Sequence, residues 1–245
     1  MDYKTYIFGD SITHGRIGSS YTRHLSKSVR PYGVDGSTFL QTKERLFTFL
    51  ENNPPATKET YIFQSGTNDL LIPHMHALGG AWALSSQQKM DAPNGPLRDD
   101  QDFERELHLM MKEIHLLYGD ISFKMCTLFP IGEVLTSSLN NKREKRNEMI
   151  KRAISHYESF GVCDIAYEAE QSLKEIADPS DYLLGSPQTL FEDGLYIQGD
   201  EQKIQHLSDQ RRLYLTLDGV HPNKSGAKMI ASALQQCLLH GRPTF

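Results

Sequence analysis

Two short polar stretches near opposite ends of the chain hold the residue types that acyl transfer requires. Ser11 follows a short apolar run ending at Gly9, and Asp218 precedes His221 by three residues. A serine hydroxyl becomes a strong nucleophile when an imidazole removes its proton and a carboxylate orients that imidazole. Because Asp218 and His221 share one loop, one turn of chain can hold the carboxylate against one ring nitrogen. The pattern predicts a serine nucleophile with His221 as its base.

The negative oxygen that forms during acyl transfer needs hydrogen-bond donors, and the sequence offers candidates after the expected strands. They are the backbone N–H of Ser11, the backbone N–H of Gly36 and the side-chain amide of Asn68. Glycine lets a substrate approach the main chain closely, and asparagine donates without adding charge near His221. We therefore expect Ser11, Gly36 and Asn68 to form an oxyanion hole.

Each of these residues also has a purely structural interpretation. A serine after a strand can cap a helix, an asparagine beside an aspartate can form a turn, and a glycine can permit a turn without any ligand. Asp218 and His221 would also fit a turn that caps the last helix. Asp10 is expected to be structural and to bond nearby backbone.

The rest of the chain must position these residues, and it alternates between two patterns. Short apolar runs indicate strands at 5–9, 60–64, 121–129 and 161–166. A further short strand, or the end of one, is expected at 33–36. Residues 11–29 are expected to form a turn and the first helix. Amphipathic stretches indicate further helices at 37–52, 102–118, 138–160 and from 224 onward. This alternation predicts an α/β fold with a parallel sheet covered on both faces.

Two stretches interrupt the alternation. Residues 73–100 lack clear periodicity, and residues 167–212 are polar with scattered glycine and proline. We interpret both as insertions into one domain that covers residues 1–245. The first is long for a connection and is therefore either functional or mobile, and the second is only marginally long enough for an independent core. Met75, Leu78 and Trp82 would either line an acyl pocket or lid, or simply pack the first insertion.

Composition narrows the classes of partner. The 26 basic and 31 acidic residues give a net charge of −5, which does not indicate a nucleic-acid-binding surface. No apolar run is long enough to span a membrane, and the start leaves no room for a signal region. The sequence therefore predicts a cytoplasmic protein without a nucleic-acid partner or a membrane span.

The residues that most often bind metals do not form a pattern here. His74 and His76 lie two residues apart, but no carboxylate or cysteine pattern completes a set of ligands. The three cysteines, Cys126, Cys163 and Cys237, have the wrong spacing for zinc and are expected to be buried thiols in a reducing compartment. Residues 142–146 are interpreted as a solvated, charged helix face.

Four blocks of this sequence resemble the consensus blocks of the SGNH hydrolase family, also called GDSL-type esterases and lipases. They occur in the family's order and span residues 9–222, as Gly9-Asp10-Ser11-Ile12, Asp35-Gly36-Ser37-Thr38 followed by Arg45-Leu46, Gly66-Thr67-Asn68-Asp69, and Asp218-Gly219-Val220-His221-Pro222. One departure is Asp35, which stands where serine is common in the family. The stretches 73–100 and 167–212 are also longer than in small members.

The resemblance implies a three-layer α/β/α, flavodoxin-like fold with a five-stranded parallel sheet. It implies that Ser11 is the nucleophile, His221 the base and Asp218 its partner, and that Ser11, Gly36 and Asn68 form the oxyanion hole. It also implies that neither a metal nor an organic cofactor is needed.

The expected activity is that of a serine esterase that works through an acyl-enzyme, with a small-molecule or carbohydrate ester as its partner. The resemblance and the polar insertions favour short acyl groups first of all, such as O-acetyl groups of a carbohydrate. An apolar tunnel formed by residues 73–100 would instead favour a lipase or thioesterase acting on longer chains. An acyltransferase that uses the same residues, or a non-catalytic binding protein of the same fold, would also fit the sequence.

Overall fold

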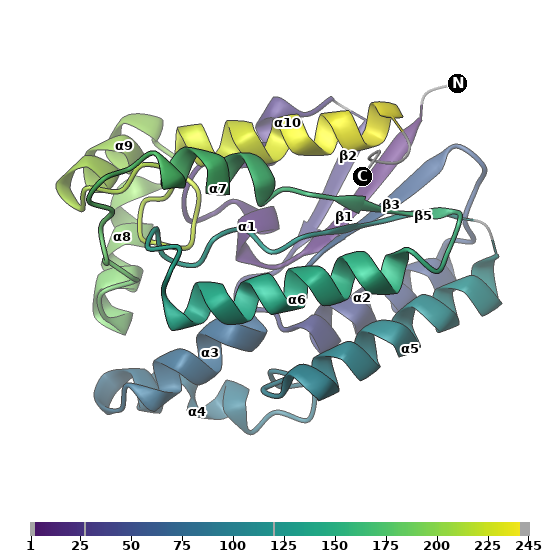
Figure 1. Ribbon diagram of the computed structural model, residues 1–245, viewed down its shortest axis with the longest axis horizontal. Helices are drawn as coiled ribbons and strands as arrows, with labels where there is room; N and C mark the ends of the chain where they lie inside the picture. The colour runs from purple at the N-terminus through teal and green to yellow at the C-terminus, as the bar shows by residue number, and fades with distance from the viewer. Residues whose placement is uncertain (1–2, 27, 120, 241–245) are drawn as a thin grey trace.

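The computed structural model describes residues 3–26, 28–119 and 121–240, so both ends of the expected domain 1–245 lie outside the described residues. These residues build a five-stranded sheet in the order β2-β1-β3-β4-β5, and each neighbouring pair is parallel (Figure 1). The strands are β1 Lys4–Gly9, β2 Val29–Gly33, β3 Glu59–Gln64, β4 Ser122–Cys126 and β5 Phe160–Cys163. This order confirms the flavodoxin-like fold.

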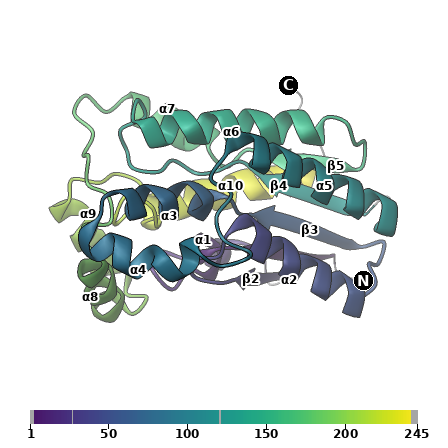
Figure 2. The same cartoon turned by 90° about the horizontal axis from the view of Figure 1, so that it is seen from below.

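Helices pack on both faces of the sheet and give three layers (Figures 1 and 2). Successive residues of β1 point to opposite faces, because side chains alternate along a strand. Phe8 belongs to one apolar cluster and Ile7 to the other. The Phe8 cluster is covered by α2 Phe39–Asn52, α5 Asp100–Tyr118 and α6 Ser138–Ile154, and the Ile7 cluster by α7 Tyr167–Lys174 and α10 Lys224–His240.

The start of α2 is set by a reciprocal cap directly after the Gly36 turn. Thr38 Oγ1 accepts a hydrogen bond from Gln41 N at 3.3 Å, and Gln41 Oε1 accepts one from Thr38 N at 3.2 Å. Such a capping box satisfies two backbone donors that the first helical turn leaves free. The cap thereby fixes Gly36 beside the helix N-terminus.

The expected helix within 11–29 is much shorter than predicted. The chain forms α1, Ser11–His14, and then a single 3₁₀ turn at Tyr21–His24. Gly15 ends α1 with φ 67°, a left-handed conformation that other residues rarely adopt. The backbone therefore leaves the helix after one turn and keeps Ser11 close to the sheet edge.

The stretch 73–100 is mostly helical, although its sequence lacks helical periodicity. It contains the C-terminal part of α3, Thr67–Ala77, and all of α4, Gly80–Met90. Only Ser86 of α4 is buried, so this helix has no apolar stripe to reveal its period. The stretch 167–212 also contains helices, namely α7, α8 Pro187–Ile197 and α9 Glu201–Gln210.

Two cysteines that were expected to be free thiols form a disulfide. Cys163 at the end of β5 is bonded to Cys237 of α10, which lies 74 positions further along the sequence, and their Cα atoms are 5.4 Å apart. Cys126 remains a buried free thiol. The prediction of unpaired thiols is therefore wrong for Cys163 and Cys237, because β5 and α10 become neighbours only in the folded chain.

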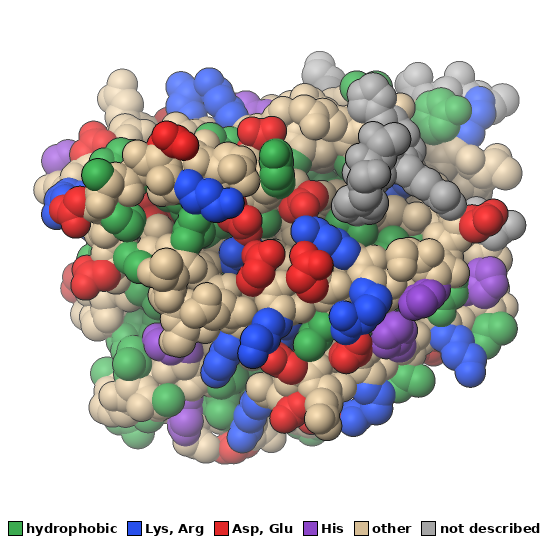
Figure 3. Space-filling model, viewed as in Figure 1, with side chains coloured by type: hydrophobic (Ala, Val, Ile, Leu, Met, Phe, Trp, Pro, Cys, Tyr) green, Lys and Arg blue, Asp and Glu red, His purple; other side chains and the backbone are tan. Residues whose placement is uncertain are grey.

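Charged side chains of both signs are interspersed over the face that carries α6 and α7 (Figure 3). The stretch 142–146 departs from its expected solvated state, since Arg143 and Arg146 are both buried. Arg143 donates to Leu128 O at 3.1 Å, and Arg146 donates to Leu97 O at 2.7 Å. Among the described helices, none has the length and hydropathy that a bilayer crossing requires.

Candidate active site

Ser11 stands at the carboxyl edge of the sheet, where ligands bind in such folds. It begins α1 directly after β1, and Asp10 caps that helix by accepting a hydrogen bond from Ile12 N at 3.0 Å. This contact agrees with the structural role expected for Asp10. Burial raises the pKa of Asp10 to about 7, against the hydrogen bond from Ile12 and the nearby charge of His221.

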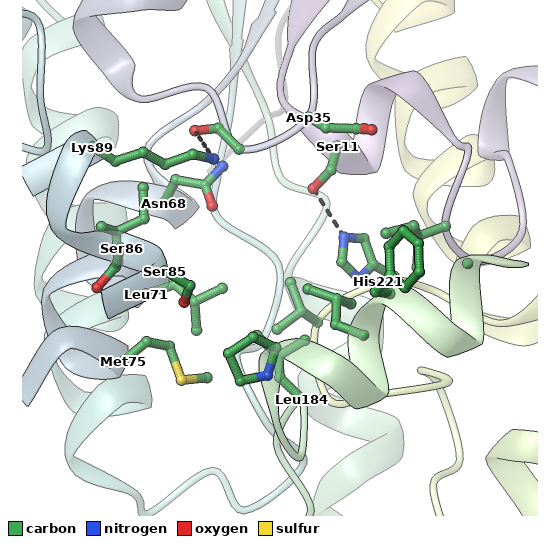
Figure 4. A pocket seen from close by; sticks show the side chains of 18 of the residues that line it. Ser11, Asp35, Asn68, Leu71, Met75, Ser85, Ser86, Lys89, Leu184 and His221 are labelled. Carbon is green, nitrogen blue, oxygen red and sulfur yellow. Dashed lines mark hydrogen bonds between the residues drawn. The ribbon is translucent and has the colours of Figure 1, made fainter. Parts of the chain in front are cut away.

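His221 comes from the loop before α10 and meets Ser11 across 210 residues of sequence. Its Nε2 lies 3.0 Å from Ser11 Oγ, and its Nδ1 lies 2.7 Å from Asp218 Oδ2 (Figure 4). Ser11 and His221 keep 7% and 5% of their surface exposed, whereas Asp218 is fully buried. The structure thus joins the three predicted residues in one hydrogen-bonded chain, with the hydroxyl at its accessible end.

The Asp218 carboxylate is the ionised end of this chain. Burial would raise the pKa of Asp218, but the facing His221 ring and the hydrogen bonds from His221 N and Val220 N outweigh it and hold that pKa below its ordinary value. Burial would likewise lower the pKa of His221, but the Asp218 charge outweighs it and raises that pKa above its ordinary value. The pair therefore favours a proton on the imidazole once Ser11 has given its proton up.

A buried carboxylate that sequence reasoning missed holds the segment leading into Asp218. Glu133 accepts hydrogen bonds from the backbone N–H groups of Tyr214, Leu215 and Thr216 at 2.7–3.0 Å, and from Thr216 Oγ1 at 2.8 Å. Four donors on one carboxylate fix the course of the backbone there. No local sequence signal marks Glu133, because its partners lie more than 80 residues away.

The three expected oxyanion donors surround the space beside Ser11. Gly36 adopts φ 69° and Asn68 lies in the first turn of α3, and both line the same pocket as Ser11. Asn68 Nδ2 donates one hydrogen bond to Ser37 O at 2.9 Å, which leaves its second N–H for a ligand. Within the described residues, the backbone N–H groups of Ser11 and Gly36 have no acceptor.

Asp69 is a second positioning residue that was not predicted. Its carboxylate accepts from Phe39 N at 2.7 Å and from Leu97 N at 2.8 Å. It thereby ties the turn that carries Asn68 to the start of α2. Burial raises the pKa of Asp69 to about 6, although these two hydrogen bonds and the charge of Arg146 oppose the rise.

A pocket of about 470 Å³ opens beside the Ser11 hydroxyl (Figure 4). Its walls come from both expected insertions, with α3 and α4 on one side and α8 on the other. Most of the wall is apolar and consists of Leu71, Ile72, Met75, Trp82, Leu184, Leu190, Phe191, Leu195 and Val220. Besides Ser11 and His221, the polar residues of the lining are Arg16, Asp35, Asn68, Ser85, Ser86 and Lys89.

The stretches 73–100 and 167–212 meet across this pocket. Trp82 Nε1 of α4 donates to Gly185 O, close to the start of α8, at 3.1 Å. Of the residues whose role was left open, Met75 and Trp82 line the pocket, whereas Leu78 is 61% exposed outside it. In the described part of the chain, no group of three or more histidine, cysteine or acidic residues is placed to hold a metal ion. His76 Nδ1 instead lies 3.1 Å from Ser86 Oγ.

Comparison with known proteins gives one family. The family model described as GDSL-like Lipase/Acylhydrolase matches residues 6–234 of the chain. A search of curated protein sequences found no match.

Several solved structures share the fold at low sequence identity. An acetylxylan esterase from Geobacillus stearothermophilus has a TM-score of 0.56 at 15% identity, with 96% of this chain and 93% of that chain covered. A member of the lipolytic protein G-D-S-L family from Veillonella parvula has a TM-score of 0.54 at 16% identity, with 97% and 98% covered. An α/β hydrolase from the metagenome of Lake Arreo has a TM-score of 0.58 at 14% identity, with 96% and 94% covered.

Proposed function

The chain belongs to the family of GDSL-like lipases and acylhydrolases, and on this premise we propose that it hydrolyses carboxylic esters through a covalent acyl-enzyme. The observation that carries the proposal is the chain of hydrogen bonds from Ser11 through His221 to Asp218, at 3.0 Å and 2.7 Å. It ends in a hydroxyl that faces a pocket large enough for an acyl group. This is the arrangement of nucleophile, base and orienting acid that acyl transfer requires.

In the first step, Ser11 Oγ attacks the ester carbonyl carbon while His221 Nε2 takes the hydroxyl proton. The carbonyl electrons move to oxygen, where the N–H groups of Ser11, Gly36 and Asn68 would stabilise the charge. When the intermediate collapses, the alcohol leaves with the proton from His221, and the acyl group stays on Ser11. Water then attacks that ester by the same route and releases the acid.

The acyl group has two candidates. O-acetyl groups on a carbohydrate are supported by the fold shared with an acetylxylan esterase, which is similar to this chain in fold only. A longer apolar acyl chain is favoured by the apolar pocket wall from α3 and α8. We favour the longer chain, since an acetyl group would leave most of that wall in contact with water, and burying each further methylene contributes about 0.8 kcal/mol.

A series of p-nitrophenyl esters from acetate to octanoate, run beside an acetylated xylo-oligosaccharide, tests both candidates. We expect kcat/KM to rise roughly fourfold per methylene over the first steps, because each methylene leaves water for the pocket wall. The variant Leu190→Trp narrows the pocket, so it should lower turnover of octanoate much more than that of acetate.

The matched control is Leu84→Trp, which adds the same side chain to α4 at a position that is 83% exposed and outside the pocket. It should leave the chain-length profile unchanged. A profile that falls steadily from acetate onward, together with fast deacetylation of the sugar, would favour the acetyl candidate. If the protein hydrolysed none of these esters, the proposed function itself would be refuted.

A further inference from the structure

Lys89 carries a positive charge from α4 into the pocket, beside two of the expected oxyanion donors. Its Nζ lies 3.4 Å from Gly36 O, and Figure 4 shows the end of its side chain next to Asn68. A Cβ atom built on Gly36 would collide with Lys89 Nζ, so the ammonium rests directly against the glycine main chain. Any side chain at position 36 would displace it.

The Lys89 ammonium has no counter-charge within the described residues. Asp35 is the nearby acid, but its carboxylate pairs with Arg16 at 2.7 Å and with His14 at 2.8 Å. The long contact with one neutral carbonyl leaves Lys89 with unused N–H donors. The Lys89 ammonium can therefore pair with an anion that forms or binds in the pocket.

Lys89 is an exposed residue, but part of its side chain is covered by the pocket wall. Burial lowers the pKa of Lys89, and the Asp35 charge opposes that effect. Charges interact more strongly beside an apolar wall than in bulk water, because the wall screens them less. An anionic substituent of the substrate bound beside Lys89 would also lie near Asp35, whose charge would repel it. An oxyanion beside Gly36 and Asn68 would instead lie next to the Lys89 ammonium.

We propose that Lys89 is a further catalytic residue, whose ammonium stabilises the negative oxygen of the tetrahedral intermediate together with Ser11, Gly36 and Asn68. The proposal rests on the ester hydrolysis proposed above. Lys89 transfers no proton in this role. The negative charge reaches the carbonyl oxygen when Ser11 Oγ attacks, and it leaves again when the alcohol or the acid departs.

The test uses Lys89→Met, which removes the charge but keeps an unbranched side chain, and Lys89→Arg, which keeps the charge. The matched control is Gln88→Met, which places the same methionine one residue earlier on α4 and outside the pocket. Thermal melting of every variant shows whether it is folded. Steady-state kinetics with p-nitrophenyl butyrate then separates kcat from KM.

A second measurement uses butylboronic acid as a probe of the intermediate. Its boron accepts an electron pair from Ser11 Oγ while His221 takes the proton, which gives a tetrahedral anion in the same place. A residue that only shapes the pocket would change KM for the neutral ester. A residue that stabilises the oxyanion changes kcat and boronic acid affinity together.

We expect Lys89→Met to lower kcat about 10- to 100-fold, with KM changed by less than about twofold and with a matching loss of boronic acid affinity. Lys89→Arg should keep most of the activity, and Gln88→Met all of it. A Lys89→Met variant that turns over ester as fast as the active wild-type protein would overturn the role of Lys89 and leave the proposed function intact. A wild-type protein without esterase activity would overturn both.

Discussion

Replacing Ser11 with alanine is expected to lower kcat for a small chromogenic ester on the order of 10⁴- to 10⁶-fold, because it removes the atom that forms the acyl-enzyme. The side-chain oxygen of Ser11 contacts only His221 within the described residues, so the fold should not depend on it. Steady-state kinetics measures the loss, and a thermal melt should be close to that of the wild type.

Ser85→Ala is the matched control, since Ser85 is another serine that lines the same pocket. Among the residues that the structure describes, its hydroxyl donates only to the backbone oxygen of Trp82, at 3.1 Å, and does not contact His221. This control should keep wild-type turnover. Wild-type turnover in Ser11→Ala would show that a different group attacks the ester.

Replacing Asp218 with asparagine is expected to lower kcat about 10⁴-fold at neutral pH, as loss of the orienting carboxylate does in serine hydrolases with this arrangement. An amide can present an N–H to His221 Nδ1, which would favour the ring tautomer with its proton on Nε2. That tautomer cannot accept the Ser11 proton. Asp35→Asn, at the rim of the same pocket, should cost less than about tenfold, because Asp35 contacts His14 and Arg16 rather than His221.

The pH dependence of kcat/KM is a second measurement of the effect of Asp218→Asn. His221 must be neutral to accept the proton, and its pKa is raised above the ordinary value, so wild-type kcat/KM should increase as pH rises through that raised pKa. Without Asp218, burial lowers the pKa of His221 and is opposed only by the charges of Asp10 and Asp35, which raise that pKa less than Asp218 does. The acidic limb of Asp218→Asn should therefore move to lower pH, and an unmoved limb would show that Asp218 does not set the His221 pKa.

The parts of this site that sequence reasoning found depend on local residue types. Ser11 and Asn68 each follow an apolar strand, and the carboxyl ends of parallel strands meet at one sheet edge. Asp218 and His221 sit three residues apart, so their mutual contact needs only one turn of chain. The meeting of Ser11 with His221 follows once the last helix packs against the sheet.

The parts that were missed depend on contacts between distant residues. Glu133 reaches backbone donors 81 to 83 residues away, and Cys163 meets Cys237 across 74 residues. Arg143 and Arg146 occupy a charged stretch that resembles a solvated helix, yet both are buried against backbone oxygens of other segments. Such positions can be recognised only when the packing of the neighbouring elements is known.

The role of the stretch 73–100 illustrates the same limit. Only Ser86 of α4 is buried, so no apolar stripe marked this helix in the sequence. The contribution of the stretch to the pocket, through Met75 and Trp82, appears only once α8 forms the opposite wall.

The central claim is that Ser11 is a nucleophile activated by His221, and covalent labelling measures this most directly. The wild-type protein is treated with an organophosphate that transfers a diethylphosphoryl group, and the modified peptide is identified by mass spectrometry. We expect a single adduct on Ser11, and labelling should be far slower in His221→Ala. An active protein that carries no adduct on Ser11, or that is labelled equally fast without His221, would contradict the account.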